Sequence, residues 1–124
     1  METFIVHITA QHGHADAVAE YYAEGEAEMK QAPGYRGRII FQAETGKMVE
    51  AVNRFYTPEE LSRDPEPPHE SPGTDFIVIE YWDSVDERMQ FAKSRKQDKK
   101  GLVVHLEPDH SHEFFTEIAN TVSL

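Results

Sequence analysis

The amino-acid sequence predicts an α+β domain in which an antiparallel sheet carries helices on one side. The chain has 124 residues, the size of one hydrophobic core, so we expect a single domain over residues 1–124. Segments that alternate apolar and polar residues, as strands do, are interspersed with segments whose apolar residues recur at helical spacing. Their order is strand, helix, strand, strand, helix, strand, which is the ferredoxin-like, split β-α-β plan.

The first half of the chain supplies a strand, a helix and a second strand. Residues 3–10 alternate, with the even-numbered side chains apolar, and predict the first strand. From Ala15 the apolar spacing becomes helical, and the helix is expected to end near Gln31, ahead of a Pro-Gly pair. Residues 35–43 alternate again and predict the second strand. Residues 47–56 are interpreted as a further extended piece.

The second half begins with an irregular insertion and ends with two strands around a helix. Thr57 opens a capping box with proline at the first helical position, which predicts one or two helical turns. The acidic, Pro-rich stretch at about residues 57–74 is expected to form an insertion loop, either a lid or, as we favour, a disordered segment. Residues 75–83 form the clearest strand, Ser84 begins a second capping box and helix, and residues 110–118 predict the closing strand.

The second face of the predicted sheet is apolar. Alternation places Ile5, Ile40, Phe76, Val78 and Trp82 on the side away from the helices. An apolar patch of this kind marks an interface or a ligand cavity.

Composition excludes several classes of function. Twelve Lys and Arg residues against 23 Asp and Glu give a net charge of −11, which repels phosphate backbones and argues against nucleic-acid binding. The absence of cysteine removes disulfides, thiolate metal sites and a cysteine nucleophile. No apolar run approaches the roughly 20 residues that span a bilayer, and the first residues lack the basic region of a signal peptide. We therefore expect a cytoplasmic protein without membrane partners.

Three motifs resemble one known family. The run Asp75-Phe-Ile-Val-Ile-Glu-Tyr-Trp-Asp-Ser84, the turn Pro33-Gly34-Tyr35 and the position of Gly13 are similar to antibiotic biosynthesis monooxygenase (ABM) domains. The resemblance covers nearly the whole chain apart from the Pro-rich insertion. It implies a dimeric α+β barrel, in which two protomers press their open sheet faces together. It also implies a substrate cleft between sheet and helices, which some members use for oxidation without any cofactor.

The chain departs from the family pattern in ways that bear on cofactors. Many members carry His-Leu where this chain has Phe91-Ala92. Haem-degrading relatives carry Trp at the position of Phe91 and an iron-ligating His at the position of Gly101, and His105 is out of register with the latter. The resemblance thus disfavours haem, and we expect no cofactor. The insertion is also longer than the loop expected for the family.

Glu80 is the most unusual residue of the predicted sheet. It shares a face with Val78 and Trp82, where an ionised carboxylate needs a partner, and Arg36 or Arg38 on the preceding strand can supply one. Two interpretations remain open. Glu80 is either a general base or half of a structural ion pair.

His7 and several aromatic residues complete the predicted site. An imidazole in the middle of the first strand is suited to accept a proton from a phenol or carbon acid, although a hydrogen-bonded core histidine is the more common role. We expect Trp82, Phe76 and Phe91 to hold a planar ring, together with Arg36.

His105, His110 and His112 form the one plausible metal cluster of the sequence. His110 and His112 would share a face of a strand, but no third ligand is fixed by spacing. We therefore predict no metal site.

These features predict a homodimer that oxidises a small aromatic compound (a phenol, anthrone or hydroquinone) with O2. The reaction type is implied by the resemblance. In this hypothesis His7 or Glu80 removes a proton, and Arg38 stabilises the enolate that forms. The alternatives are a non-oxidative lyase, isomerase or hydrolase, and a ligand-binding stress-response module with the same cavity.

Overall fold

The computed structural model describes residues 1–65 and 71–123 and contains a four-stranded antiparallel sheet of order β2-β3-β1-β4. The strands are β1 (Glu2–Ala10), β2 (Tyr35–Gln42), β3 (Thr74–Trp82) and β4 (Ser111–Phe115). The helices are α1 (Ala15–Lys30), α2 (Lys47–Phe55), α3 (Pro58–Ser62), α4 (Val85–Ser94) and α5 (Lys100–Val103). The ferredoxin-like order predicted from the sequence is confirmed, with α2, α3 and α5 added to it.

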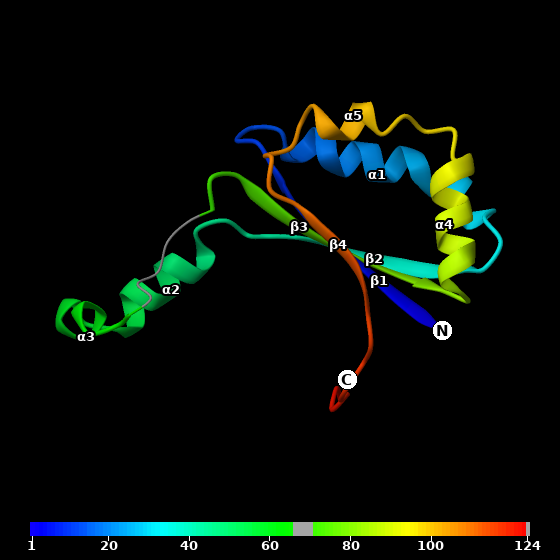
Figure 1. The fold of residues 1–124 in the computed structure, drawn as a ribbon. Coiled ribbons are helices and arrows are strands. Elements are labelled where there is room, and N and C mark those ends of the chain that lie inside the picture. The colour runs from blue at the N-terminus through cyan, green and yellow to red at the C-terminus, as the bar shows by residue number, and fades with distance from the viewer. Residues whose placement is uncertain (66–70, 124) are drawn as a thin grey trace.

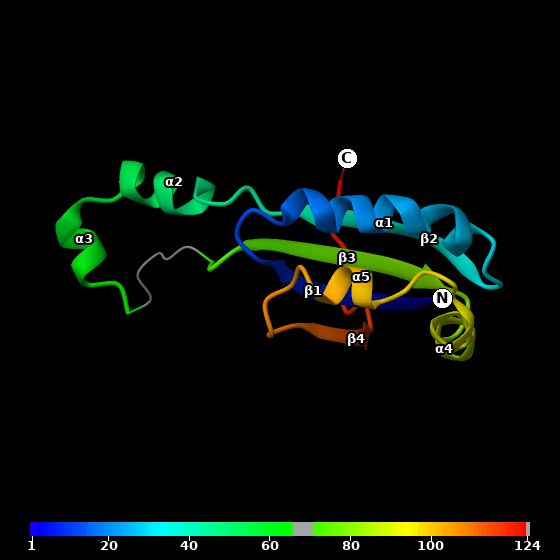
Figure 2. The same ribbon diagram turned by 90° about the horizontal axis from the view of Figure 1, so that it is seen from above.

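Helices α1, α4 and α5 cover one face of the sheet (Figure 1). Seen from above, α1 and α5 lie side by side across the strands and α4 lies at the end of the sheet (Figure 2). The core forms between these layers, where Val18, Val78 and Trp82 are completely buried. None of the described helices has the length and apolar character needed to cross a membrane.

The assignment of the two sheet faces is partly wrong. Residues that pair directly across antiparallel strands share a face, and Phe76 and Val78 pair with Ile8 and Val6 of the core. Phe76, Val78 and Trp82 therefore face the helices, and so does Ile40, which pairs with Val78. Because residues 75–83 are apolar on both sides, alternation separated the faces of this strand without showing which one the helices cover.

The opposite face is nevertheless apolar, and Figure 1 shows no helix beneath it. We call it the open face, and by register its apolar members are Ile5, Ile39, Phe41, Ile77, Ile79, Tyr81 and Phe115. Its polar members are Thr3, His7, Thr9, Asp75, Ser111 and Glu113. Ile39, Phe41 and Phe115 are exposed to solvent there. Burying these side chains would be favourable, since the free energy gained scales with apolar area removed from water.

A β-bulge interrupts the pairing of β2 with β3. Tyr35 pairs with Trp82 and Gly37 with Tyr81, which leaves Arg36 as the extra residue. Gly37 has a φ of +132°, a conformation that side chains other than glycine rarely adopt. The bulge removes Arg36 from the face that alternation assigned to it together with Arg38.

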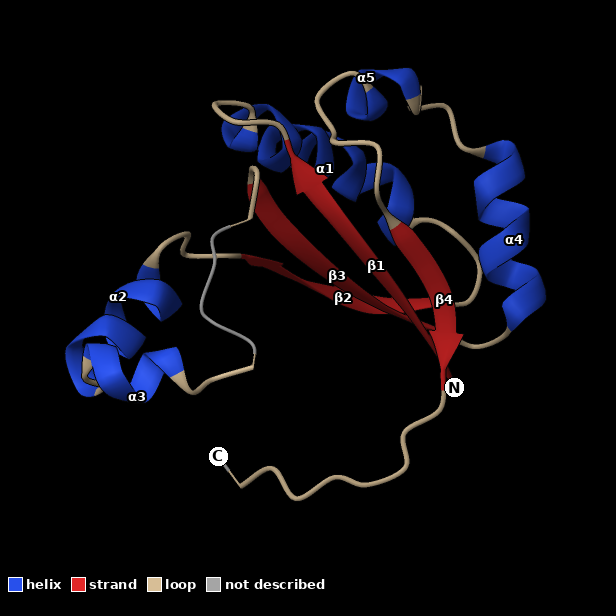
Figure 3. Ribbon diagram, turned by 60° about the vertical axis from the view of Figure 1, so that its left-hand side comes forward, coloured by secondary structure: helices blue, strands red, loops and turns tan. Residues whose placement is uncertain are grey.

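Residues 47–55 form helix α2, so the extended conformation predicted for this segment is wrong. The capping box is confirmed, because Thr57 Oγ1 accepts from Glu60 N at 3.1 Å and Glu60 Oε1 accepts from Thr57 N at 3.0 Å. Figures 1 and 3 show α2 and α3 projecting beyond the end of the sheet, and neither contains a buried residue. The predicted lid or disordered loop falls in part on residues 66–70, which lie outside the described residues.

Candidate active site

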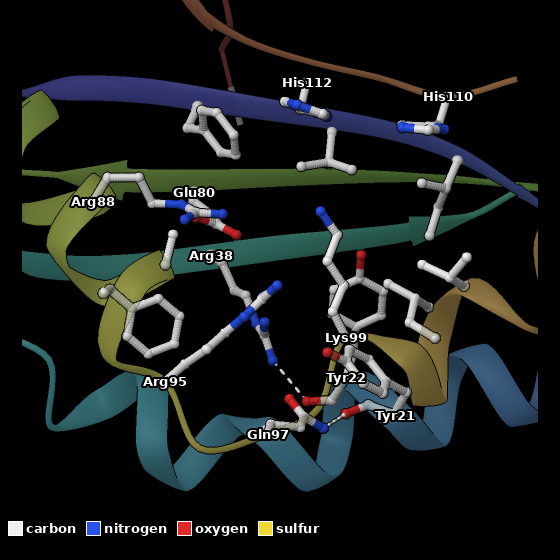
Figure 4. Close-up of a pocket in the computed structure, with 18 of the residues that line it drawn as sticks. Tyr21, Tyr22, Arg38, Glu80, Arg88, Arg95, Gln97, Lys99, His110 and His112 are labelled. Carbon is white, nitrogen blue, oxygen red and sulfur yellow. Dashed lines mark hydrogen bonds and ion pairs between the residues drawn. The ribbon is translucent and has the colours of Figure 1, made fainter.

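A cavity of about 520 Å³ lies between the sheet and helices α1, α4 and α5 (Figure 4). This volume is in the range of small-molecule sites. Apolar side chains from both layers form much of its wall: Phe4, Val6, Ile8, Met29, Met89, Phe91, Leu102, Val103, Leu106 and Phe114. Charged and polar residues also line it: Tyr21, Tyr22, Arg38, Glu80, Arg88, Arg95, Gln97, Lys99, Glu107, His110, His112 and Glu113.

Glu80 forms a buried ion pair at one end of this cavity. Its Oε1 accepts from Arg88 Nε and from Trp82 Nε1, both at 2.8 Å. The side chains of Glu80 and Arg88 are only 4% and 11% exposed. The Arg88 guanidinium also lies 4.4 Å from the centre of the Phe4 ring. Arg88 was not predicted from the sequence, which offered Arg36 and Arg38 as partners.

Arg38 lies beside Glu80 on the neighbouring strand β2, where Tyr22 and Glu26 hold its guanidinium. It is directly opposite Glu80 in the β2–β3 register, but its Nη2 donates to the Tyr22 carbonyl at 2.7 Å and lies 2.6 Å from Glu26 Oε2. Its side chain is 5% exposed, and its Nε has no hydrogen-bond partner within residues 1–65 and 71–123. Arg38 therefore lines the cavity with a fixed positive charge and a free donor.

Two tyrosines of α1 form the floor of the site. The rings of Tyr21 and Tyr22 pack edge to face, with centres 5.7 Å apart. Burial raises the pKa of Tyr22 to about 12, with the Glu80 carboxylate acting in the same direction. Burial also raises the pKa of Tyr21, while the charge of Arg95 acts in the opposite direction. Both hydroxyls therefore remain protonated at neutral pH and can donate hydrogen bonds.

The histidines are arranged as two pairs. His110 and His112 stack with ring centres 5.8 Å apart and line the cavity on the β4 side (Figure 4). His105 lies with its Nδ1 2.9 Å from His14 Nδ1 and is not part of the cavity lining. Within residues 1–65 and 71–123, no three His, Asp or Glu side chains converge as a metal site requires.

The predicted substrate-binding residues separate into three environments. Phe91 lines the cavity. Trp82 and Phe76 are buried in the core and do not contribute to the lining. Arg36 is exposed and its Nε donates to Asp83 Oδ1 at 2.7 Å, which holds the pKa of that carboxyl below its ordinary value. The position expected for Arg36 in the site is wrong because of the bulge.

His7 is not brought together with Glu80 and Arg38. It pairs with Ile77 on the open face, where its side chain is 47% exposed and its Nε2 lies 3.4 Å from Asp75 Oδ1. In β1 the even-numbered residues face the cavity, so an odd-numbered histidine is on the far side of the sheet from it.

Comparisons with known proteins agree on the fold. No family model matches the sequence, and no curated protein matches it significantly. Among solved structures, a protein of Nitrosomonas europaea assigned to the antibiotic biosynthesis monooxygenases aligns over 98% of this chain and 93% of its own, with a TM-score of 0.65 and 11% identity. SnoaB, a cofactor-independent oxygenase of Streptomyces nogalater, aligns over 98% and 97%, with a TM-score of 0.60 and 14% identity.

A third similar structure contains a bound metalloporphyrin. A mutant of MhuD with two manganese protoporphyrin IX molecules per active site aligns over 99% of this chain and all of its own, with a TM-score of 0.56 and 11% identity. The chain thus has the fold of the ABM proteins, as the sequence resemblance implied. At these identities the likeness establishes the fold, and the chemistry has to be argued from the cavity.

Proposed function

We propose that this protein is a member of the ABM family and a cofactor-independent monooxygenase acting on a small aromatic substrate. The observation that carries the proposal is the cavity of about 520 Å³, which combines aromatic walls with a fixed guanidinium and imidazoles on the SnoaB fold. Such a site can hold a planar ring, remove a proton from it and stabilise the resulting anion.

The proton acceptor we assign is His112. Glu80 also lines the cavity, but its Oε1 already accepts two hydrogen bonds, one of them from a guanidinium that stays charged. His112 faces the same side of the sheet as Phe4 and Val6, and histidine is the side chain that most often serves as a general base. Glu80 is then a positioning residue that holds Arg88 and Trp82.

The reaction follows from these groups and O2. His112 takes a proton from an anthrone-type carbon, and Arg38 stabilises the enolate charge. The electron-rich anion passes one electron to O2, and the resulting substrate radical and superoxide combine to form a C–O bond. The peroxide takes up a proton and loses water as the second proton leaves the same carbon. One oxygen atom remains in the quinone and the other leaves in water.

The open face fits a second copy of the chain. Ile39, Phe41 and Phe115 are exposed there, and self-association would bury them. We propose that this face forms the homodimer implied by the family resemblance. Native mass spectrometry of Phe41→Glu should show monomer where the unaltered protein shows dimer. Val104→Glu, an exposed substitution on the helical side, is the control and should remain dimeric.

The activity is tested with 1,8-dihydroxyanthrone in an oxygen electrode, with the uncatalysed rate subtracted. We expect catalysed O2 uptake, and 18O2 should label one quinone oxygen. His112→Ala should lower kcat by about 10²-fold or more, the usual contribution of a general base. His12→Ala, in an exposed turn away from the cavity, should have no effect.

Three other experimental outcomes would each favour a different interpretation. Turnover that persists under argon would replace the oxidative proposal with a lyase or isomerase. Binding without turnover would support a ligand-binding module. Full activity of His112→Ala together with loss of activity in His7→Ala would identify His7 as the general base and refute the assignment of His112.

A further inference from the structure

Two buried donors of the cavity have no hydrogen-bond partner in the part of the chain that the structure describes. Among the described residues, the buried side-chain polar atoms without a hydrogen bond are Tyr21 OH and Arg38 Nε. Both residues line the same cavity. Leaving a buried donor unpaired costs about 1–3 kcal/mol, so two in one cavity indicate a place where a ligand supplies acceptors.

The same cavity also contains two cationic side chains that form no ion pair with the described residues. The charges of Arg38 and Arg88 are matched by Glu26 and Glu80. Arg95 and Lys99, which follow α4 and line the cavity, form no ion pair with any carboxylate of the described residues. Figure 4 shows Arg95 and Lys99 beside the two tyrosines of α1.

The charges of Arg95 and Arg38 act to lower the pKa values of both tyrosines, against the effect of burial and of nearby carboxylates. Glu107 and Glu113 also contribute to the lining. Glu113 pairs with Ile5 of the open face, so its side chain belongs to the other side of the sheet, and Glu107 is the carboxylate that the cavity adds to Glu80.

From these contacts we propose that the cavity binds an aromatic carboxylic acid. Its carboxylate accepts from Tyr21 OH and Arg38 Nε and is balanced by Arg95 and Lys99, while its ring packs against Phe91. This inference rests on the proposed function and narrows its substrate to planar aromatic acids.

A carboxylate fits this subsite better than a phosphate does. Phosphate sites usually present several backbone N–H groups at a helix N-terminus, whereas the donors here are side chains from the middle of α1 and from β2. Side-chain donors beside guanidinium groups are typical carboxylate partners.

The test is isothermal titration of 2-naphthoate and of 2-naphthamide, its neutral isostere, under argon. We expect naphthoate to bind about tenfold or more tightly than the amide, as hydrogen bonds to a charged group predict. Lys99→Gln and Arg95→Gln should each weaken naphthoate binding about tenfold and leave amide binding within about twofold. Lys100→Gln removes the same charge from the adjacent exposed position outside the cavity and should change neither Kd.

Tyr21→Phe is the second variant, because it removes a hydroxyl without breaking any internal hydrogen bond. It should fold normally, weaken naphthoate binding and spare the amide. Equal affinity for the two ligands, or unchanged naphthoate binding in all three cavity variants, would overturn the inference.

Because this titration needs no turnover, its failure is distinct from failure of the proposed function. Selective naphthoate binding with no O2 uptake would leave the subsite standing and refute the oxygenase. O2 uptake with neutral anthrones, without any preference for naphthoate over naphthamide, would support the oxygenase and refute the carboxylate subsite.

Discussion

Replacing Arg88 with methionine should strongly destabilise the protein. The substitution keeps an unbranched apolar stem against Phe4 but leaves the Glu80 carboxylate, 4% exposed, with Trp82 Nε1 as its remaining partner. Removing one member of a buried ion pair costs about 3–5 kcal/mol, because the other charge stays in a medium of low dielectric constant. A domain of this size has a total stability of about 5–15 kcal/mol, so the variant approaches the limit of folding.

Urea denaturation at pH 7 measures this effect, with fluorescence of the single Trp82 as the signal. With an m-value of about 1.5 kcal/mol/M, a loss of about 3 kcal/mol lowers the midpoint by about 2 M. Protein concentration must be held constant, since self-association would add to apparent stability.

The double variant Glu80→Gln/Arg88→Met tests the cause. It contains neither charge, so it should be more stable than Arg88→Met alone by about 2 kcal/mol. Arg36→Met is the matched control, because the Arg36–Asp83 pair is exposed and its loss should leave the midpoint unchanged. A double variant as unstable as the single one would show that the loss came from packing, and the reasoning from buried charge would be refuted.

Three further substitutions address the floor of the site, the bulge and the projecting helices. Tyr22 has a pKa of about 12 in the folded protein against an ordinary value of 10.0, so its stabilising contribution is complete below pH 10 and is lost as pH rises from 10 to 12. The difference in urea midpoint between the unaltered protein and Tyr22→Phe should therefore be flat below pH 10 and fall above it; a flat difference throughout would contradict the raised pKa. Gly37→Ala should lower the free energy of unfolding by about 1–3 kcal/mol through backbone strain alone, because a Cβ there meets nothing within 4 Å; an unchanged urea midpoint would mean that the bulge does not hold this conformation. Thr57→Ala removes the cap of α3 and should speed amide exchange in residues 58–62 while leaving the global midpoint unchanged, because α3 has no buried residue; a loss of global stability would show that α3 packs on the sheet domain.

The order of elements could be predicted because the local signals were strong. The period of apolar residues changes from two to helical spacing after Ala10, and Pro33-Gly34 and Ser84 mark the ends of elements. The misassigned segment 47–55 also contained a signal. Met48, Val52 and Phe55 follow helical i, i+4, i+7 spacing, and this pattern outweighs their strand propensity.

The candidate site was harder to predict because it depends on contacts between elements. Alternation correctly placed Glu80 beside Val78 and Trp82, and it singled out Arg38 on the neighbouring strand. It could not reveal that Arg88 reaches Glu80 from the helix after β3, because such a contact follows from the packing of a helix on a sheet. The β-bulge at Arg36 shifted the register by one residue, and a one-residue shift exchanges the two faces of a strand.

The net charge of −11 and the proposed anion subsite are compatible because they act over different distances. Repulsion from surface carboxylates is screened within a Debye length of about 8–10 Å at physiological salt, and it grows with the number of charges on the ligand. It therefore opposes a polyanion such as nucleic acid far more than a monoanion. At the cavity Arg38, Arg95 and Lys99 attract one carboxylate over a few ångströms, a distance at which salt screens little, and the burial of Arg38 strengthens its share of that attraction. The acidic exterior and the two cavity cations that form no ion pair with the described residues together favour a small ligand with a single negative charge.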